Sequence, residues 1–201
     1  MGAGVLPIAL YKGTLFLLLG QERHNNLWCD FGGSTINGEK PYKTAIREGT
    51  EELNGFLGNE NDFETIVTCN MILSITFDRY TSYIFKTNYD EKLPLYFTNV
   101  NNFAELYLKD KIYTKDKIYT KDKIYTKDKI YTKDKIYTKD KIDTKDNGLF
   151  EKKQIQWFPL SEFRENNLRD MFRKHYIPIL DSILKNEQFI IKHIETIDSK
   201  F

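Results

Sequence analysis

The sequence has few of the residues that build disulfide frameworks or zinc sites. Its 201 residues include two cysteines, Cys29 and Cys69, and three histidines, His24, His175 and His193. The histidines are scattered without metal-ligand spacing, so we interpret them as ordinary surface or core residues. The cysteines fall in separate predicted strands, and we expect reduced core thiols in an intracellular protein, cytoplasmic or nuclear.

Long hydrophobic runs are also missing. The longest, "LFLLLG" at residues 15–20, is far shorter than the ~18 residues of a membrane span, so no membrane partner is expected. The N-terminus lacks the basic start and the small-residue cleavage site of a signal peptide. Hydrophobic residues make up 40% and aromatic residues 14% of the chain, which predicts a packed globular body. The length suits a single domain over residues 1–201.

Charge is divided unevenly along the chain, although the net charge is only +1. Residues 109–146 contain 13 Lys and 8 Asp, while the rest of the chain is mildly acidic. Six hexamers fill residues 109–144, five reading KDKIYT and the last KDKIDT. One isoleucine and at most one tyrosine per unit offer little burial against the entropy of ordering, so we predict a low-complexity, mobile insertion. Lysines interleaved with tyrosines could instead track a phosphate backbone and stack bases, which leaves RNA binding as an alternative.

The remaining sequence predicts a mixture of strands and helices. A turn at Lys12-Gly13 should join the first two strands. A helix should run from Tyr42 to Leu53, because Pro41 suits a first helical turn and Asn54-Gly55 suits a helix end. Further helix is predicted after a cap at Ser161 and over residues 167–196. Runs of β-branched, aliphatic and aromatic residues predict strands at 4–11, 14–19, 27–31, 65–77, 81–87 and 154–158.

The segment "REGTEEL", residues 47–53, concentrates carboxylates on one helix face. Glu48 lies three and four positions before Glu51 and Glu52, and three like charges at this spacing repel one another. Arg47 offsets part of that repulsion. A solvated helix face is one interpretation. The other is a Mg²⁺ or Mn²⁺ site, because these hard cations prefer carboxylate oxygens.

The opposite face of this predicted helix is apolar and small. Ala45, Ile46, Gly49 and Leu53 form a stripe that would let the helix lie close to a sheet. Upstream, Gly32-Gly33 predicts a flexible turn whose backbone can approach a phosphate group.

The spacing of these residues resembles the Nudix box, G-x5-E-x7-R-E-U-x-E-E-x-G-U, where U is a bulky aliphatic residue. The match spans residues 33–55 and includes all six fixed positions up to Glu52, which are Gly33, Glu39, Arg47, Glu48, Glu51 and Glu52. The sequence departs from the pattern at Gly49, where an aliphatic residue is usual, and at Asn54, with Gly55 one residue later. The flanks "WCDFGG" and "WFPLSEF" extend the resemblance over residues 3–108 and 147–185.

The resemblance implies a fold and an activity. Nudix proteins are α/β/α sandwiches around a mixed β-sheet, and they hydrolyse nucleoside diphosphates linked to another moiety with Mg²⁺ or Mn²⁺. By resemblance, Glu48, Glu51 and Glu52 hold the metal and Arg47 orients these carboxylates. Glu39 supports the site from the preceding loop.

The resemblance assigns other roles less firmly. Glu52 is the first candidate for the general base and Glu151 a distant one. Arg23 and Gln21 lie where family members often contact substrate, although a strand-end charge is an equal interpretation. Trp28 is a candidate pocket wall or core residue.

Several functions remain open at the sequence level. The first is a pyrophosphohydrolase acting on a small nucleotide-type molecule. Capped RNA and diphosphoinositol polyphosphates are alternative substrates, but they favour a more basic body than this one. A non-catalytic Nudix-like module that binds a nucleotide or RNA is an alternative of another class, and a homodimer is possible.

Overall fold

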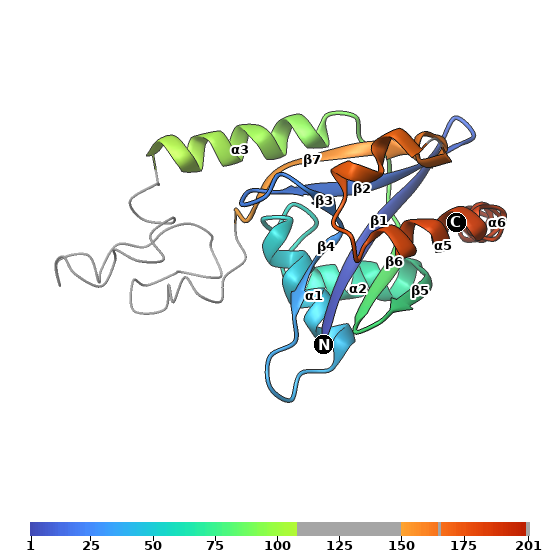
Figure 1. Cartoon of the computed structure of the whole chain (residues 1–201), viewed down its shortest axis with the longest axis horizontal. Coiled ribbons are helices and arrows are strands. Elements are labelled where there is room, and N and C mark those ends of the chain that lie inside the picture. The colour runs from blue at the N-terminus through green and yellow to red at the C-terminus, as the bar shows by residue number, and fades with distance from the viewer. Residues whose placement is uncertain (108–149, 165, 200–201) are drawn as a thin grey trace, which may run out of the picture. The chain divides into compact units, whose positions relative to one another are not determined.

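The computed structural model describes residues 1–107, 150–164 and 166–199, in which strands and helices follow one another in mixed order (Figure 1). The strands are β1 (Gly2–Tyr11), β2 (Thr14–Glu22), β3 (Trp28–Cys29), β4 (Phe31–Ser34), β5 (Met71–Phe77), β6 (Tyr80–Lys86) and β7 (Lys152–Pro159). The α-helices are α1 (Pro41–Glu52), α2 (Glu60–Asn70), α3 (Leu93–Tyr107), α5 (Ile177–Lys185) and α6 (Glu187–Asp198). Two 3₁₀ helices, η3 (Leu160–Arg164) and η4 (Asn166–Met171), follow β7.

The chain divides into two units, residues 1–98 with 149–201, and residues 99–148. The sheet, the helices α1, α2, α5 and α6, and the candidate site all belong to the first unit. Helix α3 runs from the first unit into the second. The repeat insertion predicted at 109–146 lies outside the described residues.

The sheet of the first unit is mixed. Its main path is β3-β2-β1-β6-β5, with β4 paired to β1 and β7 paired to β2. Strand β1 runs antiparallel to β2 and parallel to β6. The predicted turn between β1 and β2 is confirmed: Lys12 and Gly13 both have positive φ, 49° and 76°, as in the turns that match the twist of a hairpin.

Hydrophobic residues on the two faces of the sheet form two cores. Leu6 and Ile8 of β1 belong to a cluster that includes Ile179 of α5. Val5 points to the other face, in a cluster that includes Ile46 of α1. Figure 1 shows α1 and α2 on one side of the sheet and α5 and α6 on the other. The predicted α/β/α sandwich around a mixed sheet is therefore confirmed.

The strand predicted over residues 65–77 is wrong in its first part, where α2 occupies residues up to Asn70. The side chain of Asn59 caps this helix by accepting hydrogen bonds from the backbone N–H groups of Asn61 and Asp62. Phe63 and Val67 are buried one turn apart, which is helical rather than strand spacing. Local capping thus overrides the β-branched composition.

The cysteine prediction is correct for only one residue. Both cysteines are free thiols, but Cys69 lies exposed on α2 and only Cys29 is buried. The expectation of two core thiols fails because residues 65–70 are helical and Cys69 falls on the outer side of that helix.

The single strand predicted at 27–31 is split into β3 and β4 at Asp30. The buried Asp30 carboxylate accepts hydrogen bonds from Tyr80 Oη (2.7 Å) and Ser82 Oγ (2.6 Å) of β6. The helix predicted from Ser161 consists of 3₁₀ turns, and α3 has no counterpart in the sequence prediction. Within the described ranges, no helix is long and apolar enough to span a bilayer.

Candidate active site on helix α1

Helix α1 lies very close to the sheet because its inner face is small. Thr44, Ala45, Ile46 and Gly49 are buried there. A Cβ on Gly49 would lie 2.4 Å from Val5 Cγ2 and 2.8 Å from Phe63 Cε1. The aliphatic side chain usual at this position of the Nudix box would therefore collide, and the ring of Phe63 from α2 occupies that space instead.

The end of α1 follows the predicted sequence signals. Leu53 is the C-cap, and Asn54 and Gly55 have positive φ values of 53° and 70°. Asparagine and glycine tolerate this left-handed conformation better than other residues. The departure at Asn54 and Gly55 from the box therefore leaves the helix end intact.

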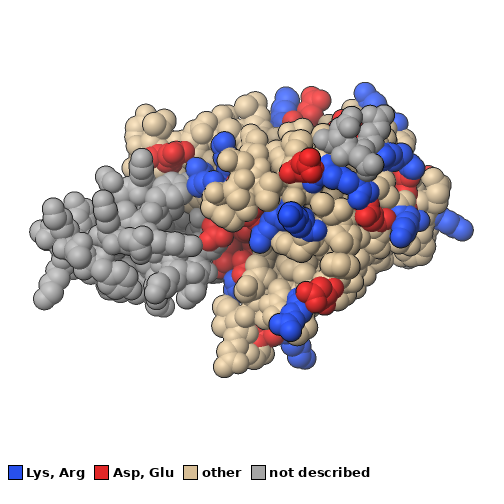
Figure 2. Space-filling model, in the orientation of Figure 1, with Lys and Arg blue, Asp and Glu red and all other residues tan. Residues whose placement is uncertain are grey.

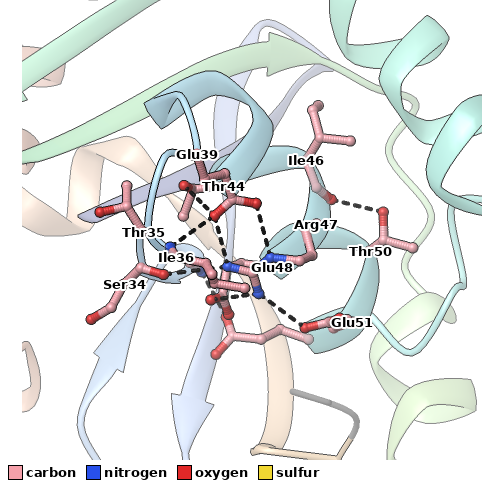
Figure 3. Close-up of polar contacts among 12 residues, drawn as sticks. Ser34, Thr35, Ile36, Glu39, Thr44, Ile46, Arg47, Glu48, Thr50 and Glu51 are labelled. Carbon is pink, nitrogen blue, oxygen red and sulfur yellow. Dashed lines mark hydrogen bonds and ion pairs between the residues drawn. The ribbon is translucent and has the colours of Figure 1, made fainter. Parts of the chain in front are cut away.

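Arg47 gathers the acidic residues of the segment around one guanidinium group (Figure 3). Its Nε and Nη2 donate to the two oxygens of Glu39 at 3.1 and 3.2 Å. Its Nη1 lies 2.8 Å from Glu48 Oε1 and 3.4 Å from Glu51 Oε2. Its Nη2 also donates to the backbone oxygen of Ser34 at 3.3 Å. One cation thus holds three carboxylates that come from the loop and from α1.

Glu39 is fixed by more than Arg47. Its Oε2 also accepts hydrogen bonds from Thr44 Oγ1 (2.8 Å) and from the backbone N–H of Ile36 (3.1 Å). The hydrogen bonds from Arg47, assisted by those from Thr44 and Ile36, lower the pKa of Glu39 to about 2. Glu39 is therefore a charged anchor for Arg47 at neutral pH.

Glu48 lies against the backbone of strand β4. A Cβ on Gly33 would be 2.5 Å from the carboxyl carbon of Glu48, so only glycine leaves room for this carboxylate. Gly32 is also constrained, because a Cβ there would lie 2.4 Å from the Cα of Gly4. The predicted flexible turn at Gly32-Gly33 is wrong, since both residues pair with β1 as part of β4. They serve close packing instead.

Glu52 is the most deeply buried acid of the box, with 2% of its surface exposed. Its Oε2 accepts a hydrogen bond from the backbone N–H of Gly32 at 2.7 Å and lies 3.2 Å from Lys152 Nζ. Burial raises the pKa of Glu52 well above its ordinary value, and the charge of Glu48 adds to the rise while Lys152 opposes it. Burial likewise raises the pKa of Glu48, and the charge of Glu151 contributes. Glu151 is therefore near the site in space.

A buried cluster behind Glu52 was not predicted from the sequence. Lys152 Nζ lies 2.7 Å from Glu22 Oε1 and 3.2 Å from Cys29 Sγ, and Arg173 Nη1 donates to the same oxygen of Glu22 at 3.1 Å. Burial alone would raise the pKa of Glu22, but Lys152 and Arg173 lower it overall. More than a hundred residues separate Glu22 from Lys152 and Arg173, so no local spacing could reveal the cluster.

The three candidates for substrate contact have different surroundings. Gln21 donates a hydrogen bond to the backbone oxygen of Asn26 and accepts one from Gln154 Nε2. Arg23 donates through Nε to the backbone oxygen of Phe150 at 3.1 Å. Trp28 is 2% exposed and packs edge-on against a phenylalanine, so it is a core residue.

The chemistry of the donors fits a hard divalent cation, although the carboxylates are not gathered into a ready coordination shell. Glu48, Glu51 and Glu52 present oxygens from consecutive turns of one helix, where their charges oppose one another. Among the described residues, no group of three His, Cys, Asp or Glu side chains lies close enough to hold a metal ion as it stands. In this arrangement Arg47 and Lys152 supply the positive charge.

No family model matches the sequence, and no curated protein matches it. Solved structures do resemble it. An Ap4A hydrolase binary complex from C. elegans is 14% identical, with a TM-score of 0.41 over 100% of this chain and 98% of that one. A bifunctional NMN adenylyltransferase/ADP-ribose pyrophosphatase from Francisella tularensis, complexed with AMP and a Mn ion, is 14% identical, with a TM-score of 0.47 over 92% and 41%.

A third similar structure is the NUDIX domain of Shewanella oneidensis NrtR complexed with ADP ribose. It is 9% identical, with a TM-score of 0.40 over 92% of this chain and 86% of that domain. At these identities and TM-scores, the likeness by itself assigns no activity to this chain.

Proposed function

We propose that this chain is a Nudix pyrophosphohydrolase that cleaves a nucleoside diphosphate linked to another moiety, using Mg²⁺ or Mn²⁺. The observation that carries this proposal is the network around Arg47. Glu39, Glu48 and Glu51, three acids of the Nudix box, meet at this one guanidinium (Figure 3). On a merely solvated helix face, we would not expect the arginine to bind a carboxylate from a loop through two hydrogen bonds.

The proposed roles follow from these contacts. Glu48, Glu51 and Glu52 would hold the divalent cation. When bound, the cation would neutralise phosphate charge and lower the pKa of the attacking water. Arg47 would keep two of the acids oriented through charge-assisted hydrogen bonds, and Glu39 would keep Arg47 in place.

The proton of the attacking water needs an acceptor. Glu52 is the first candidate, because burial raises its pKa and a raised pKa brings a carboxylate closer to a useful base at neutral pH. Glu151 is the second candidate, since its charge reaches Glu48 although it lies far away in the sequence. Glu151→Gln separates the two, because turnover should survive this change only if Glu52 is the base.

The charge of the described residues on one face of the molecule favours a small substrate over a long nucleic acid. On the face drawn in Figure 2, the described basic side chains (blue) and acidic side chains (red) are interspersed, and the basic ones do not form a continuous track. A nucleotide-type molecule needs only a few polar contacts, and Arg23 and Gln21 are candidates for them. Capped RNA and diphosphoinositol polyphosphates remain as test substrates.

The test is a hydrolysis panel with added Mg²⁺ or Mn²⁺. It would contain nucleoside triphosphates, Ap4A, ADP-ribose, nucleotide sugars, diphosphoinositol phosphates and capped RNA, with Glu52→Gln beside the wild type. We expect metal-dependent cleavage of at least one compound and its loss in the variant. Stoichiometric metal binding without any turnover would favour a non-catalytic nucleotide-binding module. Hydrolysis at the same rate with and without the divalent cation would contradict the proposal.

A further inference from the structure

Lys152 is a fully buried ammonium group beside the proposed metal site. Its side chain is 0% exposed, and Nζ lies 2.7 Å from Glu22 Oε1 and 3.2 Å from Glu52 Oε2. A buried charge is costly unless ionic and polar partners compensate for it. Lys152, at the start of β7, therefore links the end of α1 to strand β2 through charged contacts. Burying an apolar residue at this position would cost less desolvation free energy.

The surroundings of Lys152 are shaped for its long side chain. A Cβ on Gly20 of β2 would lie 2.8 Å from Lys152 Cδ and 3.0 Å from Cγ, so glycine at this position leaves space for the lysine stem. The Nζ group also lies 6.0 Å from the centre of the Phe31 ring, within range of a cation–π attraction. The surroundings thus accommodate both the aliphatic stem and the ammonium group of the lysine.

The two acids bound to Lys152 depend on it unequally. Glu22 also accepts hydrogen bonds from Arg173 Nη1 (3.1 Å) and Cys29 Sγ (3.1 Å). Among the described residues, Glu52 accepts one further hydrogen bond, from the backbone N–H of Gly32 at 2.7 Å. Loss of Lys152 would leave Glu22 with its arginine, but it would leave Glu52 without a cationic partner among the described residues.

The two carboxylate oxygens of Glu52 also differ in their contacts. The Gly32 N–H and Lys152 Nζ both address Oε2, while Oε1 makes no hydrogen bond with the described residues. From this geometry we propose that Lys152 is a positioning residue, which holds one oxygen of Glu52 so that the other faces the divalent cation. This inference rests on the proposed function. It explains why a charged residue, rather than an apolar one, is built into the start of β7.

The test measures Mn²⁺ affinity without substrate, by the electron paramagnetic resonance signal of free Mn²⁺. Lys152→Met removes the ammonium but keeps the stem. The double variant Lys152→Met/Glu22→Gln removes one cation and one anion, and so preserves the net charge of the cluster. Lys153→Met is the matched control, because Lys153 is exposed one residue along the same strand.

We expect the dissociation constant for Mn²⁺ to rise by ~10- to 100-fold in both Lys152 variants, as for other residues that orient a metal ligand, and to be unchanged in Lys153→Met. The double variant should unfold cooperatively near the wild-type temperature, so that a general loss of structure does not explain the weaker binding. On a cleaved compound, kcat should fall more than KM rises.

Other results would overturn the inference. Affinity that is unchanged or tighter in the Lys152 variants would mean that Lys152 is dispensable or competes with the metal for Glu52. Affinity restored in the double variant, or failure of both variants to fold, would mean that Lys152 acts only in the fold. If the wild type neither binds Mn²⁺ nor cleaves any compound, the proposed function fails and the inference fails with it.

Discussion

Arg47 and Glu39 face each other across a pair of hydrogen bonds, Nε to Oε1 at 3.1 Å and Nη2 to Oε2 at 3.2 Å. This two-point contact fixes the plane of the guanidinium group. The third nitrogen, Nη1, then points to Glu48 and Glu51. Glu39 thereby influences acids of α1 that it does not touch.

Replacing Glu39 by glutamine should lower the free energy of unfolding at neutral pH by about 1.5–3 kcal/mol, the range for hydrogen bonds to charged groups. The pKa of Glu39 lies at about 2 in the folded state against an ordinary value of 4.5. A lowered pKa stabilises the fold above pH 4.5, and that stability is lost as the pH falls toward about 2. Denaturant unfolding from pH 7 to pH 3 should therefore show the wild type and Glu39→Gln converging. Parallel curves would contradict the assigned role.

Alanine at Gly33 and alanine at Gly32 should have different effects. At Gly33 the three atoms nearest to the new Cβ all belong to the carboxylate of Glu48, which would shift while the fold remains. At Gly32 it meets the backbone of Gly4 and Ala3, which cannot move as easily. We expect kcat to fall at least ~10-fold in Gly33→Ala, which corresponds to about 1.4 kcal/mol in the barrier. The stability of this variant should change little. Gly32→Ala should lower the melting temperature, and equal losses of stability in both variants would refute this distinction.

Alanine at Gly49 should destabilise the protein although alanine is the better helix former. Propensity alone favours alanine by about 1 kcal/mol. The collisions with Val5 and Phe63 should reverse that sign, with a net loss of about 1–3 kcal/mol by overpacking. Val5→Ala removes the atom at 2.4 Å. Gly49→Ala should therefore lower the free energy of unfolding less in the Val5→Ala background than in the wild type. Chemical denaturation of the four proteins measures this coupling.

Deleting residues 109–146 separates the enzyme from the alternative of an RNA-binding repeat. The proposed site consists of residues from the first unit, so hydrolysis of a small nucleotide should survive the deletion. If the lysine-rich repeat binds RNA, the affinity for RNA and its salt dependence should collapse. Loss of small-substrate hydrolysis in a folded deletion variant would show that the repeat takes part in the reaction.

Local sequence signals predicted the parts of the fold that local chemistry determines. Lys12-Gly13 gave the hairpin turn, and Pro41 with Asn54-Gly55 gave the limits of α1 to within a residue or two. The β-branched composition of residues 65–70 predicts a strand, whereas the capping side chain of Asn59 begins a helix that includes them. The split of 27–31 depends on Asp30 and its partners on β6, which only the folded chain brings together.

The candidate site was only partly accessible from the sequence. The spacing of its acids placed Glu48, Glu51 and Glu52 on one helix, but it could not show that Glu52 would be buried beside Lys152. Glycine is common in turns, so the Gly32-Gly33 pair predicts a turn, whereas here the absence of side chains permits close approach of Gly4 and Glu48. Contacts between residues far apart in the chain carry no local pattern.

The proposed function requires that the acids of α1 form a metal site for pyrophosphate cleavage. The most direct measurement compares metal-dependent turnover of a cleaved panel compound in the wild type, Glu48→Gln and Glu64→Gln. Glu64 is the control, since it pairs with Lys43 on the outer side of α1 and α2. We expect turnover to fall at least ~100-fold in Glu48→Gln, which corresponds to about 2.7 kcal/mol in the barrier, and to stay at the wild-type level in Glu64→Gln. Wild-type turnover in Glu48→Gln would contradict the proposed function.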